Sequence, residues 1–187
     1  MDRCWAENHL VGIALQIDSA FYRKGDLLAK EKFPVTAAIR FLRENGIDFI
    51  ERPYKYEEEG GTETAAKALE VDEHLVIKTL VMEDEEKKPL IILMHGDREV
   101  SSKALARVIG VKLITPCVPQ VAFRQTGYMV GGISPFGTKK VLPVYVEESI
   151  LSLPRIFINA GRRGLLAEMS PADLVKILKP VPVNVAR

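Results

Sequence analysis

The segment YMVGGISPFGTKKVLP, residues 128–143, places two adjacent glycines, a Ser-Pro pair and a third glycine between two apolar runs. Gly131, Gly132 and Gly137 permit backbone conformations and close approaches that a side chain would block. Consecutive amides in such a loop can point in one direction and bind an anion or a developing oxyanion. A tight connection between two strands uses the same residue types, so this segment alone leaves both interpretations open.

A lysine, Lys78, interrupts the apolar run LVIKTLVM. If that run is a strand, Lys78 shares a face with Val76 and Leu80, and lysine is rarely buried without a partner. The pattern favours a lysine that faces a ligand, with a solvated lysine as the alternative.

A second glycine-flanked segment, NAGRRG at residues 159–164, follows another apolar run. The guanidinium groups of Arg162 and Arg163 have the planar geometry that suits phosphate or carboxylate. A solvated surface turn is the alternative interpretation.

Several common catalytic patterns do not occur in the chain. His9, His74 and His95 have no metal-ligand spacing, and the sequence contains no nucleophile elbow, Walker motif or dinucleotide-binding fingerprint. We therefore expect no metal and no cofactor. Cys117 is a candidate nucleophile if a neighbouring charge lowers the pKa of its thiol, and an ordinary half-buried cysteine is the alternative.

Composition limits the class of protein. The 187 residues are 47% hydrophobic, which is enough for one domain with a substantial core. Lys and Arg number 26 against 25 for Asp and Glu, so nucleic-acid binding requires a local basic patch. The candidates for such a basic rim are Lys103, Arg107, Lys112, Lys139 and Lys140. No apolar run is long enough to cross a bilayer, and the two cysteines form no disulfide framework, so we expect a cytoplasmic protein without a membrane partner.

The elements that must position these residues follow from capping and periodicity. Helices are predicted at 35–46, 60–71, 101–110, 119–127 and 172–179, and strands at 47–54, 74–83, 88–96, 141–148, 155–160 and 165–169. The irregular alternation predicts one mixed α/β domain over residues 31–187, with a sheet that either stays open or curls into a barrel. Residues 1–30 form a separate N-terminal arm, either poorly ordered or carrying one short amphipathic helix.

Four segments in order, TAAIRFLRENGIDF, IKTL, GYMVGGISPFG and NAGRRG, resemble the YbaK/EbsC family of aminoacyl-tRNA deacylases. That family is related to the editing domain of bacterial prolyl-tRNA synthetases, and the resemblance runs from about Val35 to Lys179. It implies a curled, largely antiparallel sheet flanked by short helices. It also implies hydrolytic removal of a wrongly attached amino acid from tRNA without a cofactor.

The resemblance assigns roles to individual residues. It implies that Lys78, Gly131 and Gly132 act in catalysis. It implies that the substrate is bound by Tyr54, Thr79, Ile133, Ser134, Pro135, Asn159, Arg162 and Arg163. The implied partner is aminoacyl-tRNA, and prolyl-tRNA synthetase is left open as a second partner.

The implied reaction does not need a histidine-based relay. An aminoacyl ester is already activated, and the adjacent ribose hydroxyl can assist its cleavage. In a cysteinyl ester the substrate's own thiol can attack the carbonyl. The protein must then position the ester and stabilise the oxyanion, for which one donor contributes about 2.7–4 kcal/mol. Two amides of the glycine loop are the expected donors.

Three positions depart from the cysteinyl-tRNA deacylase pattern: Asn159 replaces a serine, Leu166 an acidic residue and Gly60 an aromatic residue. All three concern the amino-acid pocket. They leave deacylation as the implied activity but count against a specificity for cysteine. Cys-tRNA(Pro) or Cys-tRNA(Cys) remains the simplest substrate that the resemblance implies. The alternatives are an Ala-tRNA(Pro)-type or other small-residue deacylase, and a non-catalytic module that binds aminoacyl-tRNA or a synthetase.

Overall fold

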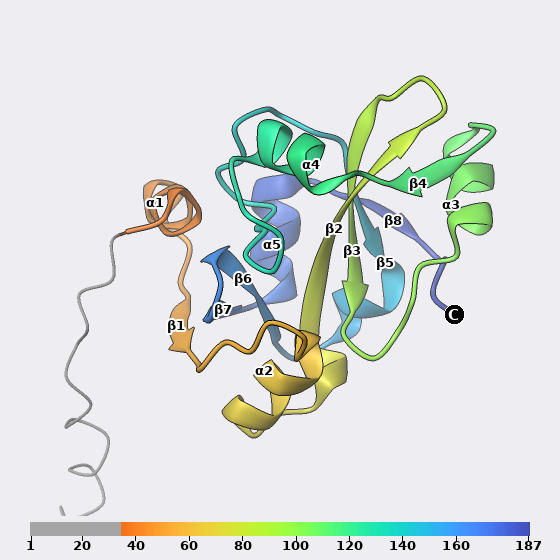
Figure 1. Cartoon of the computed structure of the whole chain (residues 1–187). Coiled ribbons are helices and arrows are strands. Elements are labelled where there is room, and N and C mark those ends of the chain that lie inside the picture. Colours follow the sequence, from red (N-terminus) through yellow and green to blue (C-terminus); the bar gives the residue numbers. More distant parts are fainter. Residues whose placement is uncertain (1–34) are drawn as a thin grey trace, which may run out of the picture. The chain divides into compact units, whose positions relative to one another are not determined.

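The computed structural model describes residues 35–187, so the expected N-terminal arm over residues 1–30 lies outside the described residues. Helices and strands alternate along the chain as in Figure 1. The helices are α1 (Ala37–Glu44), α2 (Gly61–Leu69), α3 (Ser102–Ile109), α4 (Pro119–Thr126) and α5 (Pro171–Leu178), with 3-10 turns η2 (Glu73–Leu75) and η3 (Glu148–Ser152). The strands are β1 (Ile50–Pro53), β2 (Val76–Asp84), β3 (Pro89–His95), β4 (Ile114–Pro116), β5 (Val144–Glu147), β6 (Ile156–Arg162), β7 (Leu165–Met169) and β8 (Val181–Val183).

Local capping accounts for where the helices begin and end. The side chains of Thr36, Ser101 and Ser170 accept hydrogen bonds from backbone amides in the first turns of α1, α3 and α5. Gly110 and Gly127 end α3 and α4 in the left-handed conformation that favours glycine. These signals are local, and they place the helices close to the ranges predicted from the sequence.

One mixed sheet connects all the strands in the order β1-β7-β6-β2-β3-β5-β8, with β4 added beside β2. Four strand pairs are antiparallel and three are parallel. The predicted mixed α/β fold is confirmed. Of the two forms left open by the sequence, the sheet is the open one, because β1 and β8 remain at opposite ends of the strand order.

Strand β2 has an unusual edge. On one side it pairs with β3 over most of its length. On the other side Val76 and Ile77 pair with β6, whereas Met82, Glu83 and Asp84 pair with β4. Figure 1 shows β4 and β6 beside different halves of β2. Between them, residues 78–81 have no strand on that edge within residues 35–187, and the sheet is therefore interrupted at its centre.

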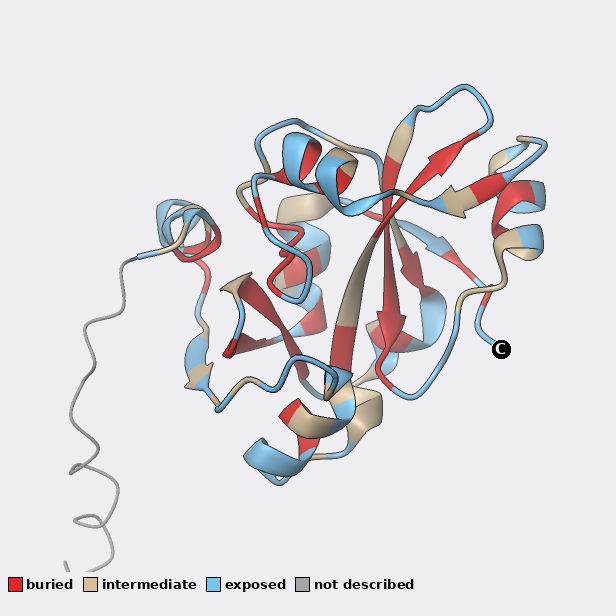
Figure 2. Ribbon diagram, viewed as in Figure 1, coloured by how far each residue is buried: buried red, intermediate tan, exposed pale blue. Residues whose placement is uncertain are grey.

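The core lies on both faces of this interrupted sheet. Buried residues concentrate on β2, β3, β6 and β7, as the red segments of Figure 2 show. The largest buried cluster includes Ile39 and Leu42 of α1, Leu174 of α5 and Phe136 of the glycine loop. The loop is thus packed into the core from one side. Within residues 35–187 no helix has the length and apolar character needed to cross a membrane.

Candidate functional site

A cavity of about 500 Å³, called here the main cavity, opens where the edge of β2 loses its neighbours. Lys78 and Thr79 of β2 line it, and Gly131 and Ile133 of the glycine loop line it as well. Much of the remaining wall is apolar and includes Ala65, Val81, Ala122 and Leu166. The gap between β4 and β6 therefore brings the lysine strand and the glycine loop, about fifty residues apart in the sequence, to one site.

The two adjacent glycines of the loop meet different requirements. Gly131 has a φ of +85°, and a Cβ at this position would lie 2.8 Å from the Tyr56 hydroxyl oxygen. A Cβ on Gly132 would lie 2.8 Å from the backbone nitrogen of Arg163. Glycine is thus required at position 131 because φ is positive there, and at position 132 because the 159–164 turn packs closely against it.

The loop amides also differ in what they bind. The Gly132 amide donates to the Met129 carbonyl oxygen at 2.9 Å, and Gly132 does not line the main cavity. The amides of Gly131 and Ile133 donate to no atom of residues 35–187, and both residues line the main cavity. The free donors at this site therefore belong to Gly131 and Ile133, not to the expected pair Gly131 and Gly132.

Asn159 and Arg163 hold the glycine loop by its carbonyl groups. The Asn159 amide nitrogen donates to the Gly131 carbonyl oxygen at 3.1 Å, and its Oδ1 accepts from the amides of Gly161 at 2.8 Å and Arg162 at 3.1 Å. The Arg163 Nε donates to the Val130 carbonyl oxygen at 2.9 Å. Both residues also line the main cavity. Because these bonds use carbonyl oxygens, they fix the loop without engaging the amides of Gly131 and Ile133.

Ser134 and Pro135, two of the predicted substrate-binding residues, lie behind this surface. Ser134 is fully buried, and its hydroxyl oxygen accepts from the Phe136 amide at 3.3 Å. Pro135 is buried too, and neither residue lines the main cavity. Tyr128 adds a bond from its hydroxyl to the Phe136 carbonyl oxygen at 2.6 Å. This half of the loop therefore packs in the core behind the residues that line the main cavity, and it supports them.

Lys78 is half-buried, and its ammonium donates to the carbonyl oxygen of Arg98. Burial lowers the pKa of Lys78, although the carboxylates of Glu73, Asp97 and Glu99 oppose that shift. An ammonium has three N–H donors, and the Arg98 carbonyl takes one of them. Lys78 thus retains donors for a ligand at the cavity wall.

Two further polar groups face the main cavity. The Thr79 hydroxyl oxygen is buried and has no hydrogen-bond partner within the part of the chain that the structure describes. Tyr54 donates its backbone amide to the Gly164 carbonyl oxygen at 2.9 Å, and burial raises the pKa of its phenol. The phenol of Tyr54 is therefore neutral, and the Thr79 hydroxyl is buried in the cavity wall.

Tyr56 is a site residue that the sequence reasoning missed. It lines the main cavity, and the Arg163 guanidinium carbon lies 5.0 Å from the centre of its ring. The alternation in RPYKYE, which puts Tyr54 and Tyr56 on one side of an extended segment, was the available signal.

The family model of the aminoacyl-tRNA editing domain matches residues 57–177. The chain belongs to this family. The match spans β2, the glycine loop and the 159–164 turn, which are the three segments that form the site.

Relatives of this editing-domain chain agree with the assignment. EbsC of Enterococcus faecalis, provisionally named a Cys-tRNA(Pro)/Cys-tRNA(Cys) deacylase, is 28% identical over 143 residues, covering 76% of this chain and 87% of EbsC. The proline–tRNA ligase of Thermodesulfovibrio yellowstonii is 26% identical over 135 residues, or 71% of this chain and 22% of the ligase.

Solved structures support the fold. A protein provisionally described as a trans-editing enzyme for prolyl-tRNA synthetase superposes with a TM-score of 0.70 at 22% identity, covering 81% of this chain and 97% of that protein. A hypothetical protein superposes with a TM-score of 0.74 at 22% identity, covering 81% of this chain and 99% of that protein. The open mixed sheet is therefore the fold of an editing domain.

Cys117 lines the main cavity of the editing domain, but its surroundings disfavour the thiolate. Burial, together with the nearby Glu83 carboxylate, raises the pKa of the thiol to about 11. The Cys117 sulfur lies 3.7 Å from Glu83 Oε2, to which it donates. The charge next to the thiol is negative, which is opposite to the charge that a cysteine nucleophile requires.

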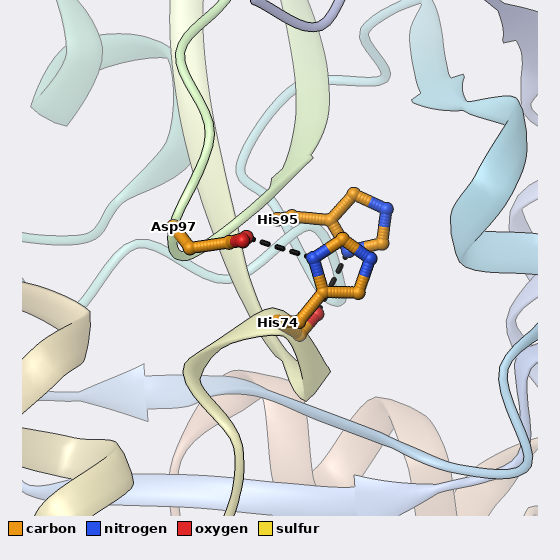
Figure 3. A group of neighbouring side chains, drawn as sticks. All are labelled: His74, His95 and Asp97. Carbon is orange, nitrogen blue, oxygen red and sulfur yellow. Dashed lines mark hydrogen bonds and ion pairs between the residues drawn. The ribbon is translucent and has the colours of Figure 1, made fainter.

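His74, His95 and Asp97 meet at the end of β3, although no sequence spacing predicted it (Figure 3). The two imidazole rings stack with centroids 3.6 Å apart, and His74 Nδ1 lies 2.9 Å from Asp97 Oδ1. His95 Nδ1 donates to the His74 carbonyl oxygen at 2.7 Å, and its Nε2 lies 2.7 Å from the Ser149 hydroxyl oxygen. With both His95 nitrogens engaged and the rings stacked, the cluster anchors the turn that carries Arg98, the acceptor of the Lys78 ammonium. One ligand atom from each of the three residues lies within 4.8 Å of the others, a grouping that the sequence spacing did not indicate.

The five residues of the expected basic rim do not line the main cavity. Lys139 and Lys140 adjoin α4 through backbone bonds to the carbonyl oxygens of Thr126 and Gln125. Lys103 and Arg107 are on α3, and Lys112 follows it. A single rim formed by all five remains a prediction.

Asn159→Asp tests whether Asn159 positions the glycine loop. The substituted carboxylate keeps the acceptor for Gly161 and Arg162 but loses the donor to the Gly131 carbonyl oxygen. We expect the unfolding free energy to fall by about 1–3 kcal/mol. Hydrogen exchange at residues 129–133 should accelerate more than exchange in β3. Unchanged exchange in the loop would contradict the positioning role, and Asn159→Ala, which removes all three bonds, provides the upper limit of the effect.

Alkylation measures the state of Cys117 directly. Because the pKa of its thiol is about 11, we expect iodoacetamide at about pH 8 to modify Cys117 at least about tenfold more slowly in the folded protein than in urea. Peptide-resolved mass spectrometry separates Cys117 from Cys4. Equal or faster modification in the folded protein would restore Cys117 as a candidate nucleophile.

Stability should depend on pH through His95. Burial lowers the pKa of His95 below its usual 6.5, so the unfolded chain binds the proton more readily than the folded protein. The unfolding free energy is therefore highest above about pH 6.5 and falls as the pH drops from there towards the lowered pKa. Thermal unfolding between about pH 7.5 and about pH 5 should show this loss. His95→Gln should flatten the curve, and an equally steep curve in that variant would exclude His95 as its source.

Proposed function

We propose that this editing domain is a trans-acting deacylase that hydrolyses the ester of a mischarged aminoacyl-tRNA. The observation that carries the proposal is that Gly131 and Ile133, whose amides have no partner within residues 35–187, line the same cavity as Lys78 and Thr79. Membership of the aminoacyl-tRNA editing family supplies the substrate class.

In the proposed reaction the ester carbonyl oxygen accepts hydrogen bonds from the Gly131 and Ile133 amides. Water attacks the carbonyl carbon, the bond to the ribose oxygen breaks, and that oxygen takes a proton. Each amide stabilises the oxyanion by about 2.7–4 kcal/mol when it is held in place beforehand. The bonds from Asn159 and Arg163 to the loop carbonyls provide that rigidity. Lys78 binds an oxygen of the substrate through its remaining N–H donors.

The amino acid that we propose is cysteine, attached to tRNA(Pro) or tRNA(Cys). A small side chain with a weak polar group suits an apolar wall that includes one unpartnered hydroxyl, that of Thr79. The name of the relative EbsC points to the same substrate. With a cysteinyl ester the substrate thiol can attack its own carbonyl and leave as a cyclic thioester, a lyase-type route. Alanine and other small residues are the competing substrates, because Asn159 and Leu166 depart from the cysteine-specific pattern.

A non-catalytic module that binds aminoacyl-tRNA or a synthetase is the second candidate. It is favoured by the commitment of the Gly132 amide to Met129, which removes one of the two expected oxyanion donors. This candidate predicts binding without ester cleavage.

The test is deacylation of a panel that contains Cys-tRNA(Pro), Cys-tRNA(Cys), Ala-tRNA(Pro) and correctly charged Pro-tRNA(Pro). We expect the cysteinyl esters to be cleaved fastest and Pro-tRNA(Pro) to survive. Lys78→Ala should lower kcat/KM about 10- to 100-fold, the effect of one hydrogen bond to a charged group. Lys88→Ala, at an exposed lysine of the β2–β3 turn, is the matched control and should change nothing. If every ester survives, the deacylase proposal fails and the binding module takes its place.

Mass spectrometry of the released product separates the two cleavage routes. Free cysteine indicates hydrolysis, whereas a cyclic thioester indicates attack by the substrate thiol. Faster cleavage of Ala-tRNA(Pro) than of the cysteinyl esters would overturn the proposed amino-acid preference while leaving deacylation intact.

A further inference from the structure

The main cavity runs along the open edge of β2 and not along one face of the sheet. The seven consecutive residues 76–82 all line it. Successive side chains of a strand point to opposite faces, so a cavity beside one face would meet only every second residue. The wall of the cavity is therefore the strand edge itself, where the backbone N–H and C=O groups lie.

Hydrogen bonds on the two sides of β2 show which of its peptide groups face the cavity. The Cys117 amide donates to the Val81 carbonyl oxygen at 3.0 Å, across the edge that also carries β4. Because the peptide groups of every second residue point to the same edge, those of Thr79 face this edge as well. The neighbouring strand agrees: Ile91, the partner of Val81 in β3, donates its amide to the Pro143 carbonyl oxygen at 2.9 Å, on the side away from β2.

Three of these peptide groups have no backbone partner on this edge within residues 35–187. The ladders with β6 and β4 stop short of residues 78–81, and Cys117 bonds the Val81 carbonyl oxygen without accepting from the Val81 amide. The edge therefore presents the Thr79 carbonyl oxygen as an acceptor between two donors, the N–H groups of Thr79 and Val81. Backbone groups without partners favour a ligand that offers a donor and an acceptor side by side.

An adenine base has this arrangement of hydrogen-bonding groups. Its N6 amino group is a donor, and the ring nitrogens next to it are acceptors. Pro116 and Cys117 line the cavity close to Val81 and give a planar base apolar surface to pack on. The cavity of about 500 Å³ lies within the range of about 300–1,000 Å³ for pockets that enclose small organic ligands, so it holds more than the ester of one small amino acid.

We propose that the open edge of β2 binds the adenine of the terminal nucleotide of the tRNA, with N6 donating to the Thr79 carbonyl oxygen and N1 accepting from the Val81 amide. The inference rests on the proposed function, because the tRNA strand ends in an adenosine whose ribose carries the ester. N6 and N1 lie on the side of the base opposite the sugar, so the ribose faces the glycine loop. The terminal nucleoside then spans the cavity from β2 to the amides of Gly131 and Ile133.

The discriminating comparison uses short RNAs that carry the same aminoacyl ester and differ in the last base. One ends in adenosine and one in purine riboside, which lacks the N6 amino group but keeps both ring acceptors. We expect kcat/KM to be about tenfold lower for the purine riboside, because the Thr79 carbonyl oxygen loses its donor. An RNA that ends in 7-deazaadenosine keeps N6 and N1 and is the matched control, with kcat/KM close to that of adenosine. Equal kcat/KM for adenosine and purine riboside would overturn the proposal.

Thr79→Val separates the backbone of Thr79 from its side chain. The variant loses the buried hydroxyl and keeps the carbonyl group, so we expect the ratio of kcat/KM between adenosine and purine riboside to stay at about ten whatever happens to the absolute rate. A ratio that falls to one in this variant would show that the hydroxyl recognises the base, and the proposed backbone site would be wrong.

Binding of an amide analogue, 3′-cysteinylamino-3′-deoxyadenosine, locates the base without catalysis. We expect the Val81 amide proton to shift downfield in NMR spectra and its hydrogen exchange to slow when the analogue binds. The Leu80 amide, which faces β3, is the internal control and should change little. A Val81 amide that neither shifts nor gains protection at saturation would overturn the inference.

Failure of the proposed function gives a different result from failure of the adenine site. If no ester is cleaved but the amide analogue binds and shifts the Val81 amide, the deacylase proposal fails and the adenine site stands. If esters are cleaved equally fast whatever the last base, the deacylase stands and the adenine site fails.

Discussion

The site depends on one interruption in backbone pairing. Strand β2 cannot continue a ladder with both β4 and β6 along the same edge, so the two strands occupy its opposite ends. The middle of β2 is left beside a cavity instead of a strand. A central strand is normally buried on both edges, and side chains there meet other side chains. Here Lys78 and Thr79 occupy a central strand and still reach a space large enough for a ligand.

The glycine loop forms another wall of this cavity, and its carbonyl and amide groups differ in their partners. Asn159 and Arg163 bind its carbonyl oxygens, and Ser134 and Tyr128 hold the buried half. An oxyanion site requires donors that are fixed before the charge develops, since any reorganisation during the reaction costs free energy. Binding the loop by its acceptors meets that requirement without using the donors of Gly131 and Ile133.

The wall of the main cavity combines apolar side chains with two cationic residues, Lys78 and Arg163. Lys78 donates to the Arg98 carbonyl oxygen in the turn that His74, His95 and Asp97 anchor. Because the net charge of the chain is close to zero, any binding of RNA has to use local cationic groups.

The sequence by itself determined the five helices, six of the eight strands within residues 35–187 and the order of the three functional segments, whereas the short strands β4 and β8 were not predicted. Caps such as Thr36, Ser101 and Gly127 act within one turn of the chain, so local pattern was sufficient to locate the helices. The resemblance of four short motifs was sufficient to indicate the family.

Only the tertiary structure decided which groups of those segments face a ligand. Whether Gly131 or Gly132 offers a free amide depends on a turn closed by Met129 and on a bond from Asn159, which lies 28 residues away in the sequence. The stacking of His74 on His95 and the contact of Tyr56 with Arg163 likewise join segments that only the folded sheet brings together. Hydrophobic periodicity records which face of an element is buried. It contains no information on which distant backbone group a particular donor will find. For this reason the open sheet, the split edge of β2 and the main cavity could not be predicted from the sequence.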